Sequence, residues 1–415
     1  MARGINEIAL LRLEVLQKFV TKFTAPPNLI LQNMFGSSDS PSSSIKWESQ
    51  TGTRGLTPFV PPGSPAPQTS PLGVAQHSAE AAFWKEKMYF DEEFLNNLRK
   101  EGTESEYLET AARLARELAG LVNRADRRRE WMFAKMMFDG SFSYYQTGGY
   151  KASVDYSIPA THLVTLGTDY KWNTGTKRNI IGDIIDGKKL IADDCGAQVN
   201  SAVCNSTVLR YLAMDPDIQT LLQKTAFGDG NLFSGSKNPI VGVNPNIIAG
   251  LLDIPNLVIY DEKYEVRANL TAVVTGGSTT VISVDDVTDF EVGETLRFHD
   301  ISEGTHEDET IASIQVEAGT VTVSTAPTAS FKAGEDRVSM TKPYIPDNKF
   351  AMIAPSVEGQ PIAEYKRAPY GVPRKYGLST DRNDEWDPEG VYIRVQDKGL
   401  PIMYHRDAHY VLTVE

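Results

Sequence analysis

Apolar residues recur at steps of three and four in two parts of the chain, which predicts two amphipathic helices. The first lies at residues 5–23 and ends before Pro26 and Pro27. The second, at about 105–138, contains no proline and a single interior glycine, Gly120. At 1.5 Å per residue it would be about 50 Å long, well beyond the usual helix of a globular domain. We therefore expect one unusually long helix in this fold.

The stretch from Gly55 to Pro71 is rich in proline. Proline lacks an amide donor and fixes φ, so this stretch predicts neither a helix nor a central strand. Structureless loops of more than about 15 residues are uncommon in compact domains. A disordered linker is one interpretation, but linkers do not favour apolar residues. The residues that predict an extended arm, buried against a neighbouring subunit, are Leu56, Phe59, Val60, Pro61, Pro62 and Leu72.

The helix at 5–23 has no apolar partner in the Ser/Pro-rich stretch that follows it. Its apolar stripe must be covered, either by a distant part of its own subunit or by a neighbouring one. Both interpretations stay open. The candidate inter-subunit contacts on this N-terminal arm are Leu13, Leu16, Phe19 and Val20.

A mixed helix and strand pattern begins at Trp172 and predicts an α/β domain. Helical spacing is found at 180–186 and 198–213, and strands are expected at 257–260 and 350–354.

Between these last two strands the chain changes character. In residues 265–342, Thr, Val, Ser and Gly alternate in short strands with turn signals at roughly ten-residue spacing. The strand-like runs are 279–284, 294–298, 310–314 and 320–323. This pattern predicts a small β-barrel or β-sandwich that is inserted into the α/β domain.

Candidate chemistry is sparse. No phosphate-binding loop, zinc-protease motif or nucleophile elbow is present. On a strand, His405, Asp407 and His409 would point to one face, as a metal site requires, but no further ligand is evident. Surface polar residues on a terminal strand explain this group better. We therefore predict no catalytic residue, no metal and no cofactor.

The net charge disfavours a reader of DNA but does not disfavour a container for DNA. The net charge of -13 opposes general affinity for nucleic acid, because phosphate binding needs Lys and Arg. The same charge suits a wall that must not stick to DNA packed inside it. The densest basic cluster lies on the long helix among acidic residues, which predicts a solvated or inter-subunit salt-bridged face. This cluster consists of Arg124, Arg127, Arg128 and Arg129.

Ten carboxylates lie between Asp285 and Glu309. Calcium binding is one interpretation, but the spacing matches no calcium loop, so a solvated acidic surface is the better one. Cys195 and Cys204, the only cysteines, are expected to be core residues. No run approaches the roughly 20 apolar residues of a membrane span, and the N-terminus has no secretion signal, so we expect folding in the cytosol and no membrane partner.

In their order and spacing, these features resemble the lambda-like major capsid protein E family of tailed bacteriophages. The resemblance covers nearly the whole chain outside 265–342. The residues that carry it are Met34–Phe35, Gly55–Gly63, the helix at 105–138, Val154–Tyr156, Trp172, the Trp386 region, Gly399–Pro401 and Asp407–Ala408.

The resemblance implies an α+β, HK-97-like capsid fold and a structural role without enzymatic activity. Copies would form hexamers and pentamers of an icosahedral head shell that encloses the dsDNA genome of a virion. Assembly would take place in the cytoplasm of the host bacterium, with a scaffolding protein, a portal and often a decoration protein as partners. The implied divisions are an N-terminal arm at 1–45, an extended loop at 46–90, a peripheral domain with its spine helix at 91–170, an axial domain at 171–264 and 343–415, and the inserted module at 265–342.

Three alternatives stay open. An encapsulin-like cargo shell shares the fold but packages an enzyme. A metal-dependent enzyme would use His405, Asp407 and His409. A carbohydrate-binding tail protein would use the β-module, but that module contains no tryptophan to serve as an aromatic platform.

Overall fold

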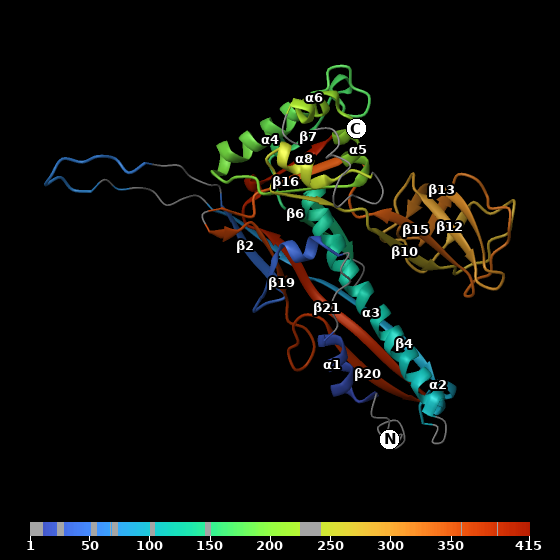
Figure 1. Cartoon of the computed structure of the whole chain (residues 1–415). Coiled ribbons are helices and arrows are strands. Elements are labelled where there is room, and N and C mark those ends of the chain that lie inside the picture. Colours follow the sequence, from blue (N-terminus) through green and yellow to red (C-terminus); the bar gives the residue numbers. More distant parts are fainter. Residues whose placement is uncertain are drawn as a thin grey trace. The chain divides into compact units, whose positions relative to one another are not determined.

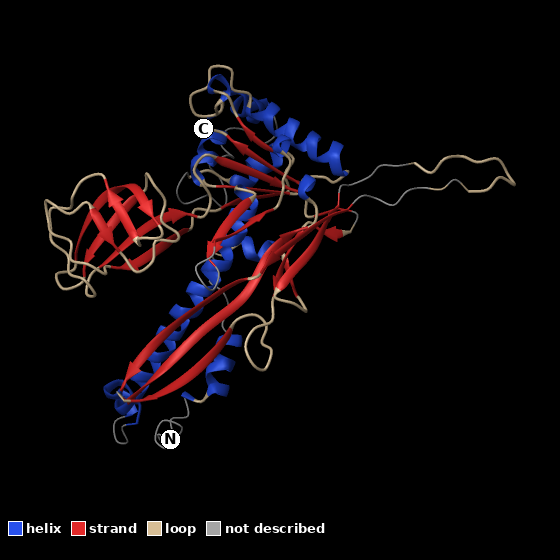
Figure 2. Ribbon diagram, turned by 180° about the vertical axis from the view of Figure 1, so that it is seen from behind, coloured by secondary structure: helices blue, strands red, loops and turns tan. Residues whose placement is uncertain are grey.

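Contacts between residues divide the chain into two units. The first comprises Met1–Tyr260 and Ile345–Glu415, and the second is Asp261–Tyr344. Figure 2 shows helices and sheets in the first unit and a cage of strands in the second. The computed structural model describes residues 11–22, 29–50, 56–66, 68, 74–99, 104–145, 151–224, 242–357, 359–387 and 389–415 (Figure 1).

The predicted long helix is present as α3 (Glu104–Phe138), which spans 35 residues. At 1.5 Å per residue it is roughly 52 Å long. Its buried side chains recur at helical spacing and pack on strands of the long sheet below it, where Phe90, Ile393 and Val395 are also buried. Burial of this stripe on the sheet contributes more to the stability of so long a helix than helix propensity alone does. The stripe contains Leu114, Leu118, Leu121, Val122 and Ala125.

The long sheet is organised around β21 (Glu389–Met403). The first part of β21 pairs antiparallel with β4 (Ala82–Asp91) on one side and β20 (Ser379–Trp386) on the other. Its last part pairs with β19 (Ala363–Arg367), which in turn pairs in parallel with β1 (Gly36–Asp39). In both views α3 runs along β4 and β21 (Figures 1 and 2). Helix and sheet together form one elongated layer pair.

Residues 31–35 are attached to α3 by hydrogen bonds and ring stacking. The buried Glu130 carboxylate accepts hydrogen bonds from the backbone amides of Leu31 (2.7 Å) and Gln32 (2.9 Å), at the start of the 3-10 turn η3 (Leu31–Met34). Phe35 stacks on Phe133 with ring centroids 5.3 Å apart. Burial raises the pKa of Glu130, although these amides oppose the rise. Helix α1 (Leu13–Lys22) precedes this anchor.

Two hairpins complete this part of the first unit. In one, β2 (Ser44–Gln50) pairs with β3 (Val74–Glu80), and in the other β5 (Ser141–Tyr145) pairs with β6 (Lys151–Asp155). The proline-rich loop joins β2 to β3. The remaining short elements are α2 (Glu92–Arg99), η4 (Ala160–His162), η5 (Thr168–Tyr170), β17 (Ser356–Val357), β18 (Gln360–Pro361) and η6 (Arg406–Ala408).

The α/β part of the first unit is built on a five-stranded sheet in the order β7-β22-β16-β8-β9. Cys195 and Cys204 are free and buried, as predicted. Helix α4 ends at Gly196, which takes a φ of 74° that favours glycine. The strands are β7 (Leu163–Thr165), β22 (His409–Thr413), β16 (Lys349–Ile353), β8 (Ser201–Cys204) and β9 (Asn256–Ile259), and the helices are α4 (Ile180–Cys195), α5 (Ser206–Met214), α6 (Pro216–Lys224) and α8 (Pro245–Leu251).

The single helix predicted at 198–213 is wrong. Its first part is strand β8, whose residues are all buried between β16 and β9, and only the second part is helical, as α5. A short apolar run does not reveal by periodicity whether it is a buried strand or a helix. Asn205 marks the boundary, because its side chain accepts a hydrogen bond from the Val208 amide at 3.0 Å and caps α5.

The second unit is a six-stranded sheet in the order β10-β15-β12-β13-β14-β11. A bridge between Leu270 and Val284, just beyond the two outer strands, closes the sheet into a barrel. Phe298 and Phe331 stack at 5.1 Å inside it. The four predicted strands are present, whereas β10 and β15 were not predicted. The strands are β10 (Lys263–Asn269), β11 (Val281–Ser283), β12 (Thr295–Asp300), β13 (Thr305–Gln315), β14 (Thr320–Val323) and β15 (Arg337–Pro343).

None of the helices in the described part of the chain combines the length and the hydropathy that crossing a membrane requires.

Candidate functional site

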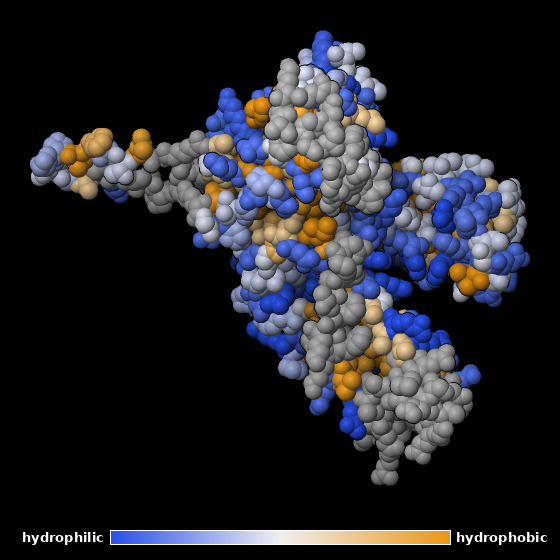
Figure 3. Space-filling model, viewed as in Figure 1, coloured by the Kyte–Doolittle hydropathy of each residue, from blue (hydrophilic) through white to orange (hydrophobic). Residues whose placement is uncertain are grey.

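The proline-rich loop presents apolar side chains to solvent. In its described part, residues 56–66, every residue is exposed, Pro61 and Pro62 included. Leu56 is 95% exposed and Phe59 is 105% exposed. Hydrophobic residues stand out along this segment in Figure 3. Burying such a side chain contributes about 1.5–3 kcal/mol, so the loop is a strong candidate for a contact surface.

Two predicted loop residues need separate mention. Val60 is 47% exposed. Leu72 lies outside the described residues, as do Gly55 and Pro71 at the limits of the predicted arm.

The N-terminal helix is largely an intramolecular contact. Leu16 is 2% exposed and packs in one cluster with Leu95, Leu114 and Ile393, so its prediction as an inter-subunit contact is corrected: it is a core residue of its own subunit. Leu13 is 43% exposed and remains available to a neighbour. The side chains of Phe19 and Val20 lie outside the described residues.

The arginine cluster on α3 does not form one solvated face. Arg124 is exposed and pairs with Glu86 across to β4. Arg127 is exposed, and the guanidinium of Arg128 lies 5.2 Å from the centre of the Trp131 ring. Arg129 instead points into the subunit, so its predicted solvated or inter-subunit role is corrected.

Arg129 belongs to a buried ion-pair network. Its Nε donates to Asp397 Oδ2 at 2.7 Å, and the Tyr365 hydroxyl donates to the same oxygen at 3.2 Å. Burial lowers the pKa of Arg129, but Asp397, Tyr365 and Asp126 together outweigh it and raise that pKa. The network joins α3 to β21 and β19. Sequence reasoning missed it because Arg129 and Asp397 are 268 residues apart.

His405, Asp407 and His409 do not form a metal site. The strand on which they were expected is interrupted by η6, so the side chains do not alternate across a sheet. All three are buried, which corrects the interpretation as surface residues. Over the described residues, no group of three His, Cys, Asp or Glu side chains could hold a metal ion. The cluster is a polar part of the core.

Hydrogen bonds within the chain hold the His162 ring, which lies beside this cluster. The buried His162 ring contacts the His409 carbonyl oxygen through Nδ1 at 2.8 Å and Asp194 Oδ2 through Nε2 at 2.8 Å. Burial, with a smaller effect of His162, lowers the pKa of His409 to about 3. His409 is therefore neutral in the folded subunit at ordinary pH.

Several carboxylates between Asp285 and Glu309 form ion pairs within the barrel. Asp308 forms a two-point ion pair with Arg297, at 2.7 and 2.8 Å. Lys342 pairs with Glu291 and, at 3.0 Å, with Glu294. These contacts tie neighbouring strands together and favour the interpretation as a structural acidic surface.

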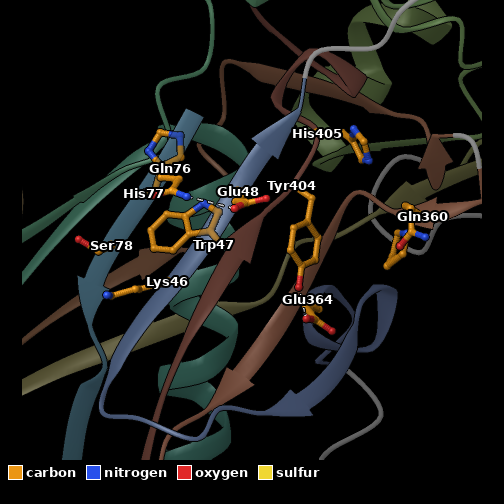
Figure 4. A pocket seen from close by; sticks show the side chains of 11 residues that line it. Lys46, Trp47, Glu48, Gln76, His77, Ser78, Gln360, Glu364, Tyr404 and His405 are labelled. Carbon is orange, nitrogen blue, oxygen red and sulfur yellow. Dashed lines mark hydrogen bonds between the residues drawn. The ribbon is translucent and has the colours of Figure 1, made fainter. Parts of the chain in front are cut away.

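A groove that sequence reasoning missed lies beside the β2–β3 hairpin. Its volume is about 980 Å³. Figure 4 shows Trp47 and Tyr404 on its two sides, with Glu48 between them. Because residues from both ends of the chain form its walls, no local sequence motif predicts this groove. The lining residues are Lys46, Trp47, Glu48, Gln76, His77, Ser78, Gln360, Pro361, Glu364, Tyr404 and His405.

A long helix on a long antiparallel sheet, a second α/β sheet and an exposed loop on an extended hairpin define a capsid subunit of the HK-97-like fold. A sequence model described as "Phage major capsid protein E" matches residues 13–290. The match spans more than half of the chain, which therefore belongs to the phage major capsid protein E family and is a structural protein of the viral capsid. No curated protein matches the sequence.

The chain is similar to several solved structures. A putative capsid protein of a prophage in E. coli CFT073 is 12% identical, with a TM-score of 0.50 over 96% of this chain and 95% of that one. A phage-related protein from Bordetella bronchiseptica RB50 is 11% identical, with a TM-score of 0.48 over 96% of both chains. A chain of the Staphylococcus phage Andhra capsid is 8% identical, with a TM-score of 0.43 over 95% and 86%.

Proposed function

We propose that copies of this chain assemble into hexamers and pentamers, which close into an icosahedral head shell around a dsDNA genome. The observation that carries the proposal is the loop at 56–66, which is uncharged, proline-rich and apolar and contains no buried residue, in an otherwise well-packed subunit. Contacts of this kind run head to tail, and head-to-tail contacts close into rings.

The energetics suit an assembling loop. Prolines at 58, 61, 62 and 65 restrict the backbone before docking, so little conformational entropy is lost on binding. Each buried Leu56 or Phe59 side chain contributes about 1.5–3 kcal/mol. Repeated over every subunit, such modest contacts become strong through multivalency.

We further propose the division of the first unit that the resemblance implies: arm at 1–45, extended loop at 46–90, peripheral domain at 91–170 and axial domain at 171–264 and 343–415. The arm and the loop cross to neighbouring copies, with Leu13 among the contacts of the arm. Arg124, Arg127 and Arg128 lie on the solvent side of the spine helix, where ion pairs to a neighbour would form.

The β-barrel is proposed to stand on the outer side of the shell. Asp261–Tyr344 contains 16 acidic and 6 basic residues, so it carries -10 of the net charge of -13. Beside packed DNA, so negative a unit would be repelled, whereas outside it keeps particles apart in solution. From that position it would reinforce the shell or take the place of a decoration protein.

The role proposed is structural throughout, with no catalysis and no cofactor. Assembly in the host cytoplasm with a scaffolding protein, a portal and, at the outer face, a decoration protein is the expectation from the family. The DNA is enclosed without specific binding, because the net negative charge opposes phosphate contacts.

The test is to replace Leu56, Phe59 and Val60 with serine and to keep the prolines. The variant should remain a folded subunit, because none of these side chains is buried in its own chain, and should fail to form particles. The readouts are thermal unfolding and negative-stain electron microscopy.

The matched control replaces Val292, an exposed valine of the barrel that is 60% accessible, with serine. That variant should assemble normally. Shells of normal appearance from the triple serine variant would contradict the proposal.

A further inference from the structure

One outer face of the barrel gathers positive charge in a unit that is otherwise strongly acidic. Asp261–Tyr344 contains 16 acidic and 6 basic residues. All three of its arginines and both of its histidines lie on four neighbouring strands, β10, β15, β12 and β13. We call this set the arginine face. Its members are Arg267, Arg297, His299, His306 and Arg337.

The strand register places the arginines on one side of the sheet. Arg267 on β10 and Arg297 on β12 both lie opposite Ser339 of β15. Arg337 is two residues before Ser339 and lies opposite His299. Residues opposite one another are about 4.5–5.5 Å apart at Cβ, and diagonal neighbours are about 7–8 Å apart. The alternate residues of these strands form the buried core of the barrel, so the arginines project outward.

Carboxylates of the described residues pair with two of the three guanidinium groups. Arg267 pairs with Glu265, and Arg297 forms the two-point pair with Asp308. No residue that the structure describes forms an ion pair with Arg337, and the Nε of Arg337 is covered without a hydrogen-bond partner. The arginine face therefore has one guanidinium charge more than its carboxylates balance.

His299 shows that the three charges act on one place. Burial lowers the pKa of His299. The guanidinium groups of all three arginines lower it further, and Glu265 opposes them. An anion at this place would therefore meet several positive charges at once.

We propose that the arginine face binds a compact oxyanion such as inorganic phosphate, with Arg337 as its principal donor. A guanidinium group presents two parallel N–H donors to two oxygen atoms of such an anion. The anion would supply the missing negative charge and would link β15 to the arginines of β10 and β12. The site lies within a single barrel, so it goes beyond the proposed assembly and needs no second copy.

The surrounding charge favours a compact anion over a polyanion. The unit is strongly acidic as a whole, although it contains all three arginines. A nucleic acid or an acidic polysaccharide would extend past the arginine face and over acidic surface, which repels it. A phosphate ion keeps its charge within the face. A DNA-binding surface would instead need an extended stripe of basic residues.

Titration of the unassembled full-length chain with phosphate tests the proposal. Sodium chloride at the same ionic strength is the control, because any salt screens exposed charges. NMR of labelled histidines follows His299, whose pKa should rise toward or above 6.5 as phosphate binds, since an anion favours the charged imidazolium. The histidine signals of the first unit should not move. A pKa of His299 that is the same in phosphate and in chloride would overturn the proposal, and this result needs no variant.

Two charge-removing variants locate the site. Arg337→Gln should weaken phosphate binding about tenfold in isothermal titration calorimetry, because it removes the guanidinium without a counter-ion. Lys332→Gln removes one positive charge elsewhere in the barrel, from a side chain that is 63% exposed and pairs with Glu335, and should bind phosphate like wild type. Thermal unfolding in chloride verifies that both variants are folded.

Equal weakening by the two substitutions would mean that binding follows net charge alone and would reject the site. Polyphosphate that bound far more tightly than phosphate, per phosphate group, would reject a compact anion as the ligand.

Discussion

At the scale of single residues, the contact between Arg129 and Asp397 is a buried ion pair that joins the spine helix to its sheet. The Asp397 side chain has no exposed surface, and its Oδ1 also accepts the Lys398 amide at 2.8 Å. A carboxylate so placed neutralises a cation that the core could not otherwise hold. The spine helix is thus attached to β21 by charge as well as by apolar packing.

Asp397→Asn should lower the free energy of unfolding of the unassembled chain by about 3 kcal/mol, because it removes the closest counter-ion of the buried Arg129 and leaves only Asp126, at 3.3 Å. Urea denaturation measures the change. Asp169→Asn, which removes the partner of Lys177 from an exposed pair at 3.4 Å, is the control and should have little effect. Equal effects of the two substitutions would show that Asp397 does not stabilise the spine.

His409 makes the stability of the subunit depend on pH. Its pKa in the folded chain, about 3, lies below the ordinary value of 6.5, so the folded state binds fewer protons than the unfolded state. The resulting stability is present above about pH 6.5 and is lost as the pH falls toward 3. By pH 4 the loss should be about 3 kcal/mol.

With His409→Leu, the free energy of unfolding should therefore fall less steeply than in wild type as the pH is lowered. The raised pKa values of Asp407, Asp126 and Glu130 act in the opposite direction, but they are common to both proteins and cancel in the comparison. His306→Gln, on the exposed side of β13, should keep the wild-type slope. If the free energy of unfolding fell equally steeply at acid pH in wild type and His409→Leu, His409 would not be the source of this pH dependence.

At the scale of elements, replacing either of two helix glycines with alanine should change the stability of the chain in opposite directions. A Cβ at Gly187, on the buried side of α4, would lie 2.4 Å from Met352 Cε and 2.7 Å from Tyr410 Cε1. At Gly120 in α3, a Cβ would meet nothing within 4 Å. The close approach of α4 to its sheet thus depends on glycine at position 187, whereas the packing of α3 does not require glycine at position 120.

Gly187→Ala should destabilise the chain by about 1–3 kcal/mol through overpacking. Gly120→Ala should stabilise it by about 0.5–1 kcal/mol through helix propensity. Thermal unfolding of the unassembled chain compares the two directly. A stabilising Gly187→Ala would mean that α4 does not pack on β16 and β22 as described.

The same scale shows which elements sequence could predict. The helix at 105–138 was predictable because its periodic stripe is long and free of proline, and the barrel strands because turns separate them regularly. β8 was mistaken for helix because a strand buried on both faces has no alternation. β10 and β15 were missed because their pairing joins segments about 70 residues apart, as in Val266 with Met340, and a short window does not record it.

For the candidate site, the limit of prediction is tertiary contact. The exposed loop at 56–66 follows from its own composition. Leu16, Arg129 and the His405–His409 group were misplaced because their burial is set by partners that are remote in sequence. The groove at Trp47 and Tyr404 could not be predicted at all, since it exists only after the two ends of the chain have met.

At the scale of the whole molecule, stability and assembly are carried by different parts. The spine helix with its sheet, the α/β sheet and the closed barrel each have their own buried core, whereas the loop at 56–66 contributes no buried residue to the subunit. Deletion of the loop should therefore prevent assembly of the shell and leave the fold of the subunit unchanged.

The most direct test of this account is a cryo-electron microscopy reconstruction of particles formed by the purified chain, expressed with its scaffolding protein if needed. We predict closed icosahedral shells built of hexamers and pentamers, with the loop of each copy on its neighbour and the acidic barrel on the outer face. A chain that stays monomeric or forms only open aggregates at every protein and salt concentration would contradict the proposed assembly.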